Sequence, residues 1–368
     1  YLLFLNYLFY DSPKYAWNVL EHCDSMDLFR ENTLEICHFC GITQMHLDLI
    51  QRRMAWFDKV GSISTHLSRF EVSYVAFGEE HYPSLLAETA TPPLILYYRG
   101  DLSVLNYPGF AVVGPRKVSS YGADVARELS RQLLPYFVLV SGMALGVDSL
   151  AHQMALEQGC PTIAVVGTGL DTVYPRQNVK MARHIAEKGL LLSEFPIGVG
   201  GRPIHFPQRN RIVSGLSHGV LVCEGGSRSG SLITARLALE QGREVFSVPG
   251  SIFSKNSAGV HQLIQDGAKL TICLDDIMSE FPEFQSGLSI YKEGLKKPET
   301  ASGRAILSKD EQFLLSFLSE NQMVDQMVSK SEWSVHRVLQ VLTLLEIKGI
   351  VEMVGDQSYQ CVNQSVVG

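Results

Sequence analysis

The sequence lacks long apolar runs and an even, clustered set of cysteines, and both absences limit which classes of protein it can belong to. The longest apolar stretch near the start, residues 1–5, breaks at Asn6 and resumes only to Tyr10. It is far shorter than the roughly 20 apolar residues that span a bilayer, so we expect no membrane span. No basic segment precedes this stretch, as a secretory signal requires, and we expect it to form the apolar face of a first helix.

The seven cysteines are an odd number spread along the chain, which favours reduced thiols and a cytoplasmic location over a disulfide framework. Cys37 and Cys40 form the only CxxC pair. As half of a zinc site it would need further ligands such as Cys23, His22 or His46. Because the chain has no second CxxC and no HxxxH, buried thiols in a helical segment are the favoured interpretation, and we expect no metal.

Composition indicates a folded globular protein: 46% of the 368 residues are hydrophobic, 19% are charged and the mean hydropathy is +0.07. This length predicts two or three domains. The formal charge is −7, but its distribution is uneven. Residues 200–260 hold seven basic and three acidic side chains, a balance of +4, whereas residues 308–368 hold four and eight, a balance of −4. A polyanion would therefore bind the middle of the chain.

The hydrophobic pattern changes character along the chain. Residues 1–65 have apolar positions at helical spacing, such as Leu47, Ile50, Met54 and Phe57, and predict a small helical domain. After a proline-containing connector, short β-branched runs alternate with helical periods, which predicts an α/β domain over residues 66–280 whose parallel sheet is covered on both faces. The expected strands are Phe110–Val113, Phe137–Val140, Thr162–Val166, Leu190–Leu192, Val220–Cys223, Glu244–Val248 and Lys269–Ile272.

Small or polar residues end nearly every one of these strands, for example Gly114, Gly142, Gly167 and Glu194. In doubly wound folds the carboxyl ends of the strands lie along one edge of the sheet, where ligands bind. The loops that follow the strands are therefore expected to form one site.

The end of the chain predicts a third domain. Residues 281–304 are poor in apolar side chains and predict a linker, and residues 305–368 predict a winged helix. Its expected elements are a helix over Lys309–Ser319, a short helix over Met323–Val328, a longer helix over Glu332–Lys348 and a hairpin through Gly355 and Asp356.

Residues 224–235, EGGSRSGSLITA, lie between a predicted strand and a predicted helix. Small residues let the backbone approach a ligand, and a helix start directs free N–H groups toward it, so Ser229, Gly230 and Thr234 are candidates for an anion cradle. On their own the serines would indicate only a capped helix. The Gly-Lys-Ser/Thr ending of a Walker A loop is absent, so we do not expect ATP hydrolysis.

Two further loops carry arginines. Gly114-Pro115-Arg116-Lys117 ends the first expected strand of the parallel sheet, and a guanidinium there suits phosphate, although a helix-capping surface arginine is the alternative. The segment Phe206-Pro207-Gln208-Arg209-Asn210-Arg211 combines an aromatic ring, an amide and two guanidinium groups, which favours single-stranded nucleic acid. The alternative is an arginine pair in interdomain salt bridges.

Catalytic candidates are few. Ser141, Asp148 and His152 suggest a hydrolase triad, but the Asp and His have helical i, i+4 spacing and no GxSxG accompanies the serine, so a local helix contact is favoured. Glu194 and Glu224 end two strands as either general bases or partners of the arginines, and the sequence leaves both open.

Five ordered motifs, SGMALGVDSLAH (141–152), GTGLDTVYP (167–175), FPQRNRIVSGLS (206–217), SGSLITA (229–235) and GREVFSVPG (242–250), resemble the DNA-processing protein A (DprA/Smf) family. The resemblance implies an extended Rossmann-like sheet, a helical domain similar to a sterile alpha motif (SAM) and a winged helix. It also implies a cytoplasmic, non-enzymatic homodimer without a cofactor, which binds and protects single-stranded DNA without sequence preference during natural transformation (competence) and helps load the recombinase RecA.

The resemblance, together with the loop analysis, predicts a nucleic-acid-binding set of fourteen residues: Gly114, Arg116, Ser141, Gly142, Gly167, Tyr174, Phe206, Gln208, Arg209, Asn210, Arg211, Ser229, Gly230 and Thr234. The family's Gly-Ser-Arg loop falls on residues 114–116, where Pro115 replaces the serine and removes a backbone donor. Arg116 and Arg211 are expected to converge on one rim.

The winged helix has a charge balance of −4 and is a poor partner for duplex DNA, so we expect it to contact protein or another part of the chain.

The alternative function is a nucleotide-processing enzyme resembling the nucleoside monophosphate phosphoribohydrolases, which have a glycine loop near a glutamate. The next acid after this chain's glycine loop, Glu240, is a helix length away, which weakens that alternative.

Overall fold

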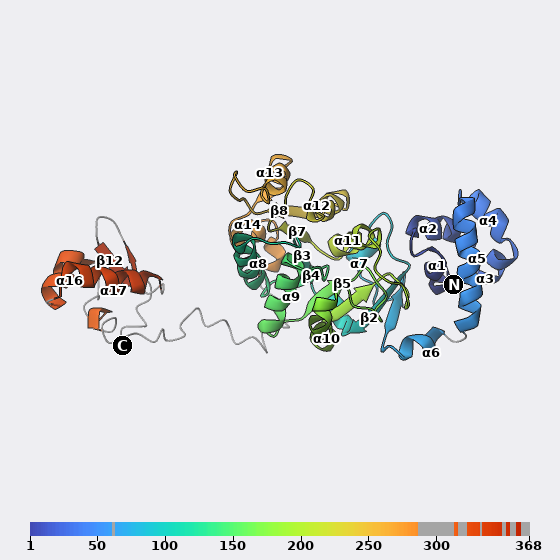
Figure 1. Ribbon diagram of the computed structural model, residues 1–368, viewed down its shortest axis with the longest axis horizontal. Helices are drawn as coiled ribbons and strands as arrows, with labels where there is room; N and C mark the ends of the chain where they lie inside the picture. The colour runs from blue at the N-terminus through green and yellow to red at the C-terminus, as the bar shows by residue number, and fades with distance from the viewer. Residues whose placement is uncertain are drawn as a thin grey trace. The chain divides into compact units, whose positions relative to one another are not determined.

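The computed structural model in Figure 1 describes residues 1–60, 63–285, 313–315, 322–331, 333–347, 351–353 and 358–361. The chain divides into two compact units, Tyr1–Gly294 and Leu295–Gly368. Most of the expected linker, from residue 286 on, lies outside the described residues. Within the described part of the chain, no helix has the length and apolar character needed to cross a membrane.

The chain begins with short helices, as the apolar spacing predicts. Large side chains close their interior: Phe4 and Phe29 are fully buried with ring centroids 5.9 Å apart. Local signals start the helices, since Pro13 begins α2 and the Ser25 hydroxyl accepts a hydrogen bond from the Leu28 N–H of α3. The helices are α1 (Leu2–Phe9), α2 (Pro13–His22), α3 (Met26–Glu31), α4 (Thr33–Phe39), α5 (Gln44–Val60) and α6 (Ile63–Ser68).

The first unit is built on a nine-stranded sheet of order β1-β2-β6-β5-β4-β3-β7-β8-β9. Seven strands match the expected runs and are parallel to one another. They are β3 (Gly109–Val113), β4 (Val138–Ser141), β5 (Thr162–Val165), β6 (Leu190–Ser193), β7 (Gly219–Val222), β8 (Glu244–Ser247) and β9 (Lys269–Leu270).

Two strands were not expected, so the sheet is mixed rather than wholly parallel. β1 (Ser73–Ala76) pairs antiparallel with β2 (Ile95–Gly100), and β2 pairs antiparallel with β6. The segment that was interpreted as a connector therefore extends the sheet by two strands. Its prolines lie between the strands, where they do not interrupt a ladder.

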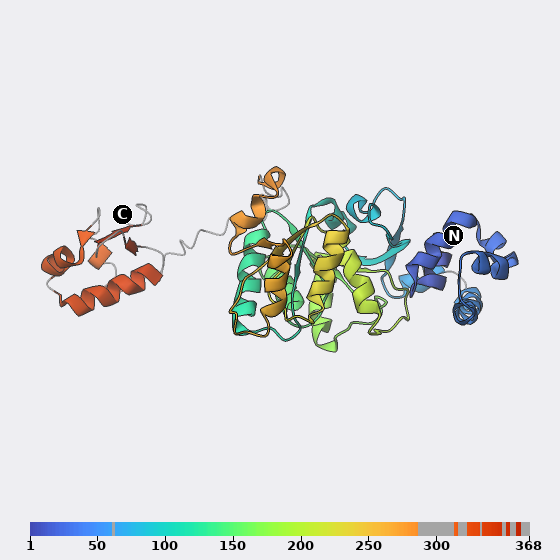
Figure 2. The same cartoon turned by 90° about the horizontal axis from the view of Figure 1, so that it is seen from above.

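Helices cover both faces of the sheet (Figures 1 and 2). α8 (Ser120–Leu133), α9 (Val147–Glu157) and α10 (Val179–Lys188) pack on one face, and α11 (His205–Gly215) and α12 (Ser231–Glu240) pack together on the other. Strand order reverses between β3 and β7, so the loops that follow these two strands diverge there and leave a crevice. The remaining helices are α7 (Ser84–Ala87), α13 (Ala258–Gln265), α14 (Leu274–Met278) and the 3₁₀ turns Leu102–Asn106, Arg176–Asn178 and Pro282–Phe284.

One apolar core joins the N-terminal helices to the sheet. Phe4 and Leu8 of α1 belong to the same buried cluster as Ile95 and Tyr97 of β2 and Ile185 of α10. Polar contacts reinforce it, because the Tyr97 hydroxyl donates to the Asn6 side chain over 2.9 Å.

The second unit has the order of a winged helix. α16 (Val324–Ser331) and α17 (Val335–Ile347) correspond to the short and long helices expected, and β11 (Val351–Met353) pairs antiparallel with β12 (Ser358–Cys361). Residues 313–315 are helical and β10 (Gln322–Met323) completes a three-stranded sheet. The rest of the expected helix Lys309–Ser319 and the turn at Gly355 and Asp356 lie outside the described residues.

Candidate nucleic-acid interface

A groove of about 760 Å³ opens at the carboxyl end of the sheet, at the crevice between β3 and β7. Its walls come from the loop after β3, the loop after β4, one face of α11 and the glycine-serine loop before α12. Ten of the fourteen predicted residues line it: Gly114, Arg116, Gly142, Tyr174, Phe206, Arg209, Asn210, Ser229, Gly230 and Thr234.

The charge of this groove is strongly positive. Arg116, Lys117, Arg228 and Lys255 are exposed in its lining, and in the described part of the chain none of the four has a carboxylate partner within 4.0 Å. With Arg209 the lining holds five cations and one acid, Asp148. Cations that share an open groove without counter-charges attract an anion with several charged groups.

Arg209 forms the floor of the groove. It is buried, and one of its terminal nitrogens donates to the carbonyl oxygens of Gly142 and Val165. Its Nε donates to the Asn210 side chain over 3.1 Å. Burial lowers the pKa of Arg209 to about 10, which still leaves the guanidinium charged at neutral pH. A Cβ at position 142 would lie 2.3 Å from the Arg209 guanidinium, so the guanidinium occupies its present place only beside a glycine.

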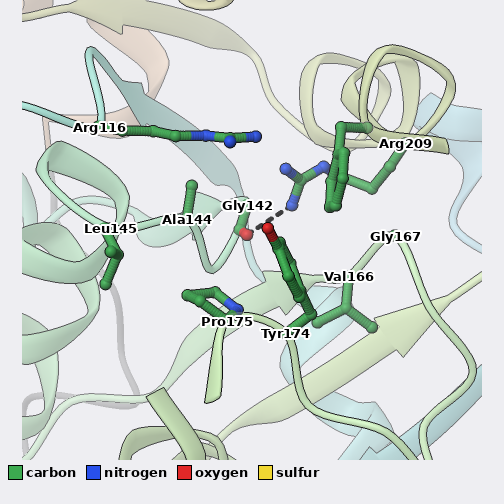
Figure 3. A pocket seen from close by; sticks show the side chains of 10 residues that line it. Arg116, Gly142, Ala144, Leu145, Val166, Gly167, Tyr174, Pro175 and Arg209 are labelled. Atoms are coloured by element: carbon green, nitrogen blue, oxygen red, sulfur yellow. Dashed lines mark hydrogen bonds between the residues drawn. The ribbon is translucent and has the colours of Figure 1, made fainter. Parts of the chain in front are cut away.

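A small recess continues from the groove beside Arg209, and Figure 3 shows its lining. Arg116 extends across one side and the Tyr174 hydroxyl points inward from the other. The Arg116 guanidinium carbon lies 5.4 Å from the Phe206 ring centroid, and the Tyr174 and Phe206 centroids are 5.3 Å apart. Gly167 also lines the recess, close under Phe206. Two aromatic rings beside guanidinium groups provide faces on which a nucleobase can stack.

The glycine-serine loop is held from behind by neighbouring segments. The Gly225 N–H donates to the Asn256 carbonyl over 2.8 Å, and the Gly225 carbonyl accepts from Gly259 of α13 over 2.8 Å. The hydroxyls of Ser229 and Ser231 are 2.7 Å apart at the start of α12. The loop is thus fixed with its small residues and the helix N-terminus toward the groove, an arrangement that favours an anion.

Pro115 has a structural partner of its own. Its carbonyl accepts from the Val147 N–H over 3.4 Å at the start of α9, and a Cβ on Gly146 would lie 2.2 Å from this oxygen. Gly146 has φ +83°, a conformation that favours glycine.

Three predicted residues lie away from the groove. The Ser141 hydroxyl is buried and donates to the Val112 carbonyl over 2.7 Å. Gln208 and Arg211 line neither the groove nor the recess. Arg211 instead pairs with the buried Glu194 and donates to the Thr91 carbonyl over 2.7 Å. The expectation that Arg116 and Arg211 converge on one rim is wrong, because residues 209 and 211 are about 200° apart around a helix and only Arg209 faces the groove.

The acidic residues are engaged in structural contacts. Glu194 binds Arg211 and Gln208, which favours the interpretation of Glu194 as a partner of an arginine. The Glu224 carboxylate accepts from the N–H and hydroxyl of Ser119 at the start of α8, over 3.0 and 2.7 Å. Asp148 accepts from the Ala144 N–H over 3.2 Å.

The hydrolase triad, which the helical spacing of Asp148 and His152 disfavours, does not assemble. The His152 ring nitrogen Nδ1 lies 2.8 Å from the Thr162 hydroxyl, and Ser141 is tied to a backbone carbonyl. Elsewhere, the thiols of Cys23 and Cys40 donate to backbone carbonyls, those of Ser25 and Asn18, and Cys37 is buried. Over the described ranges, no group of three or more His, Cys, Asp or Glu side chains is arranged to hold a metal.

Three cations of the groove were not predicted individually: Lys117, Arg228 and Lys255. Lys117 and Arg228 lie within segments that the sequence singles out, and Arg228 and Lys255 contribute to the +4 balance of residues 200–260. That balance was the signal that could have identified Arg228 and Lys255.

The fold and groove define a Rossmann-like protein with a cationic groove at its switch point and a C-terminal winged helix. The model of the family described as DNA recombination-mediator protein A matches residues 73–282, and that of the DprA winged helix domain matches residues 297–357. The chain belongs to the DNA recombination-mediator protein A (DprA/Smf) family.

Similarity to individual proteins supports the same family assignment. DNA processing protein DprA of Streptococcus pneumoniae is 45% identical over 220 residues, 59% of this chain and 77% of the relative. The X-ray structure of the S. pneumoniae protein has a TM-score of 0.63 at 37% identity, covering 75% of this chain and 98% of the other. A Helicobacter pylori DNA processing protein A structure, which concerns that protein's single-stranded DNA binding mode, has a TM-score of 0.53 at 32% identity and covers 59% and 98%.

Proposed function

We propose that this protein binds single-stranded DNA in the groove, gripping the sugar–phosphate backbone without sequence preference. The observation that carries the proposal is the set of four exposed cations without carboxylate partners in the described structure, above the buried Arg209. Phosphate neutralisation by Lys and Arg supplies sequence-independent affinity. The single-stranded DNA binding of the H. pylori relative supports the same proposal.

The aromatic rings favour an unpaired strand over a duplex. Phe206 and Tyr174 line the recess beside Arg116, where an unstacked base has access to their faces. Base–aromatic stacking contributes about 1–3 kcal/mol per base and is tolerant of sequence. In a duplex the bases are stacked on one another, so this contribution would be lost.

The proposal extends to what happens to the bound strand. We further propose that the protein protects incoming DNA in the cytoplasm during transformation, helps load RecA and acts as a homodimer without catalysis. The family description, recombination mediator, supports the loading role. The test is RecA filament formation on single strands covered by a single-strand-binding protein, followed with and without this protein. An unchanged rate would contradict the loading role.

The salt dependence of binding tests the groove directly. We expect the affinity for an oligo(dT) strand to fall linearly on a log–log plot against salt, and Arg116→Ala to make the slope shallower by about 0.7, the contribution of one single-strand phosphate contact. Arg99→Ala is the matched control, because Arg99 is an ion-paired arginine on β2 outside the groove. Fluorescence anisotropy at several salt concentrations provides both slopes. Equal slopes for wild type and Arg116→Ala would contradict the proposal.

A nucleotide-processing enzyme is the alternative, and the groove offers it little. The one carboxylate in its described lining, Asp148, is buried and hydrogen-bonded to backbone, and Glu224 is occupied by Ser119. A general base needs access to substrate. We therefore expect no release of free base from AMP-like substrates, and release at an ordinary enzymatic rate would favour the alternative.

A further inference from the structure

Helix α11 has two functional faces. Phe206, Arg209, Asn210 and Val213 lie on one side, as helical periodicity requires, and line the groove. His205, Gln208 and Arg211 lie on the opposite side and contact other parts of the first unit. The position of the groove side chains is therefore tied to whatever the opposite face contacts.

Glu194, at the end of β6, is the centre of the contacts on that opposite face. It is 1% exposed, and its two carboxylate oxygens bind different residues of α11: one pairs with Arg211, and the other accepts from Gln208 Nε2 over 2.9 Å. Arg211 is anchored a second time by the Thr91 carbonyl. A buried carboxylate that accepts from two side chains one helical turn apart fixes the rotation of the helix about its axis.

Residues of α1 and of the turn that follows it also hold α11 and Glu194 in place. Gln208 Nε2 also donates to the Tyr10 carbonyl over 2.6 Å, and His205 Nε2 lies 3.1 Å from an Asp11 oxygen. The Asn6 side chain donates to the Glu194 backbone carbonyl over 3.1 Å. These contacts join α1, β6 and α11 at the back of the groove.

The geometry points to a positioning role for Arg211 and Gln208: through Glu194 they hold α11 so that Arg209 and Phe206 face the DNA groove, and they do not themselves contact the strand. This inference rests on the proposed function for its consequence, DNA affinity. The paired arginines of the Arg209-Asn210-Arg211 motif thus act differently, one facing the groove and one facing the interior.

The test uses the full chain with Glu194→Gln, Arg211→Met and the double variant. Each single variant is expected to weaken oligo(dT) binding about three- to thirtyfold, the range for a coupled contact network, and the salt slope is expected to be the same in Glu194→Gln and Arg211→Met because both act through the position of α11. The double variant is expected to bind as weakly as either single variant, since both changes remove the same contact, the Glu194–Arg211 pair. A shallower slope for Arg211→Met than for Glu194→Gln, or additive losses, would overturn the inference in favour of direct DNA contact by Arg211.

Three controls keep the result interpretable. Arg99→Met removes a different ion-paired arginine and is expected to leave affinity unchanged. Circular dichroism at the assay temperature establishes that each variant is folded, and Gln208→Leu, which retains the Glu194–Arg211 pair, replaces any variant that is not. Unchanged affinity in folded variants would overturn the positioning role.

A readout without DNA separates this inference from the proposed function. Amide hydrogen exchange over residues 205–215 is expected to be faster in Arg211→Met than in Arg99→Met, because α11 loses its anchor. If the wild type did not bind oligo(dT), the proposed function would fail while this comparison still tested the anchor. Equal exchange in the two variants would overturn the anchor itself.

Discussion

His152 is a fully buried histidine that stays neutral in the folded protein. Burial, and to a lesser degree the neighbouring Arg209 charge, lowers its pKa to about 3. In the unfolded chain the ring takes up a proton near pH 6.5. The folded pKa is thus depressed, so acidification below about pH 6.5 favours the unfolded state, which binds the extra proton.

Because the pKa of His152 differs between the folded and unfolded states, the stability of the protein should fall at acid pH, and replacing His152 should remove this part of the fall. Between pH 7 and pH 5, His152 is expected to reduce the free energy of unfolding by about 2 kcal/mol. His152→Gln should therefore show a pH dependence shallower than wild type by that amount. Urea unfolding of both proteins at the two pH values measures it, and equal dependence would contradict a neutral buried His152.

Gly142 allows Arg209 to occupy the groove floor. A Cβ at 142 would overlap the guanidinium, so Gly142→Ala should displace Arg209, destabilise the fold by about 1–3 kcal/mol and weaken DNA binding. Gly200→Ala is the matched control, since a Cβ there meets nothing within 4 Å. Unfolding and binding measurements on both variants check the effect, and equal behaviour would exclude a steric requirement at 142.

Among the secondary-structure elements, α13 supports the groove indirectly. A Cβ on its residue Gly259 would lie 2.6 Å from the Gly226 carbonyl and 2.7 Å from that of Gly225. Gly259→Ala should therefore push the glycine-serine loop out of place and reduce single-strand affinity, whereas Gly200→Ala, where a Cβ meets nothing within 4 Å, should leave affinity unchanged. Anisotropy titrations compare them, and equal affinity would show that the loop does not need this support.

The elements also show what the sequence could predict. Seven strands were predicted because parallel strands buried on both faces are continuously apolar. β1 and β2 were missed because they are separated by a proline-rich segment and pair antiparallel with partners far along the chain, β2 with β6. Ten of the predicted residues meet in the groove because carboxyl ends of parallel strands share an edge.

The prediction that Arg211 lies on the rim of the groove failed for a different reason. Its residue type suits phosphate, but its partner Glu194 lies 17 positions away in the sequence, and the pairing depends on how α11 packs. Residue type and local spacing do not reveal which face of a helix turns inward when both faces are polar. The same limit applies to Gln208, whose amide contacts Tyr10 and Glu194 instead of the groove.

On the scale of the whole molecule, every residue of the groove belongs to the first unit. Most of the second unit, residues 308–368, has a charge balance of −4. Deleting residues from Gly303 onward is therefore expected to change single-strand affinity by less than about twofold, since it removes no groove cation. Binding assays on the truncated and full chains make the comparison, and a large loss of affinity would assign DNA contacts to the winged helix.

The core that α1 shares with β2 and α10 has a consequence for how the first unit comes apart. Ile95, Tyr97 and Ile185 are buried in one apolar cluster with side chains of the N-terminal helices. Deleting those helices would expose these apolar side chains to solvent and make the protein prone to aggregation. Heat should therefore melt them together with the sheet in one cooperative step.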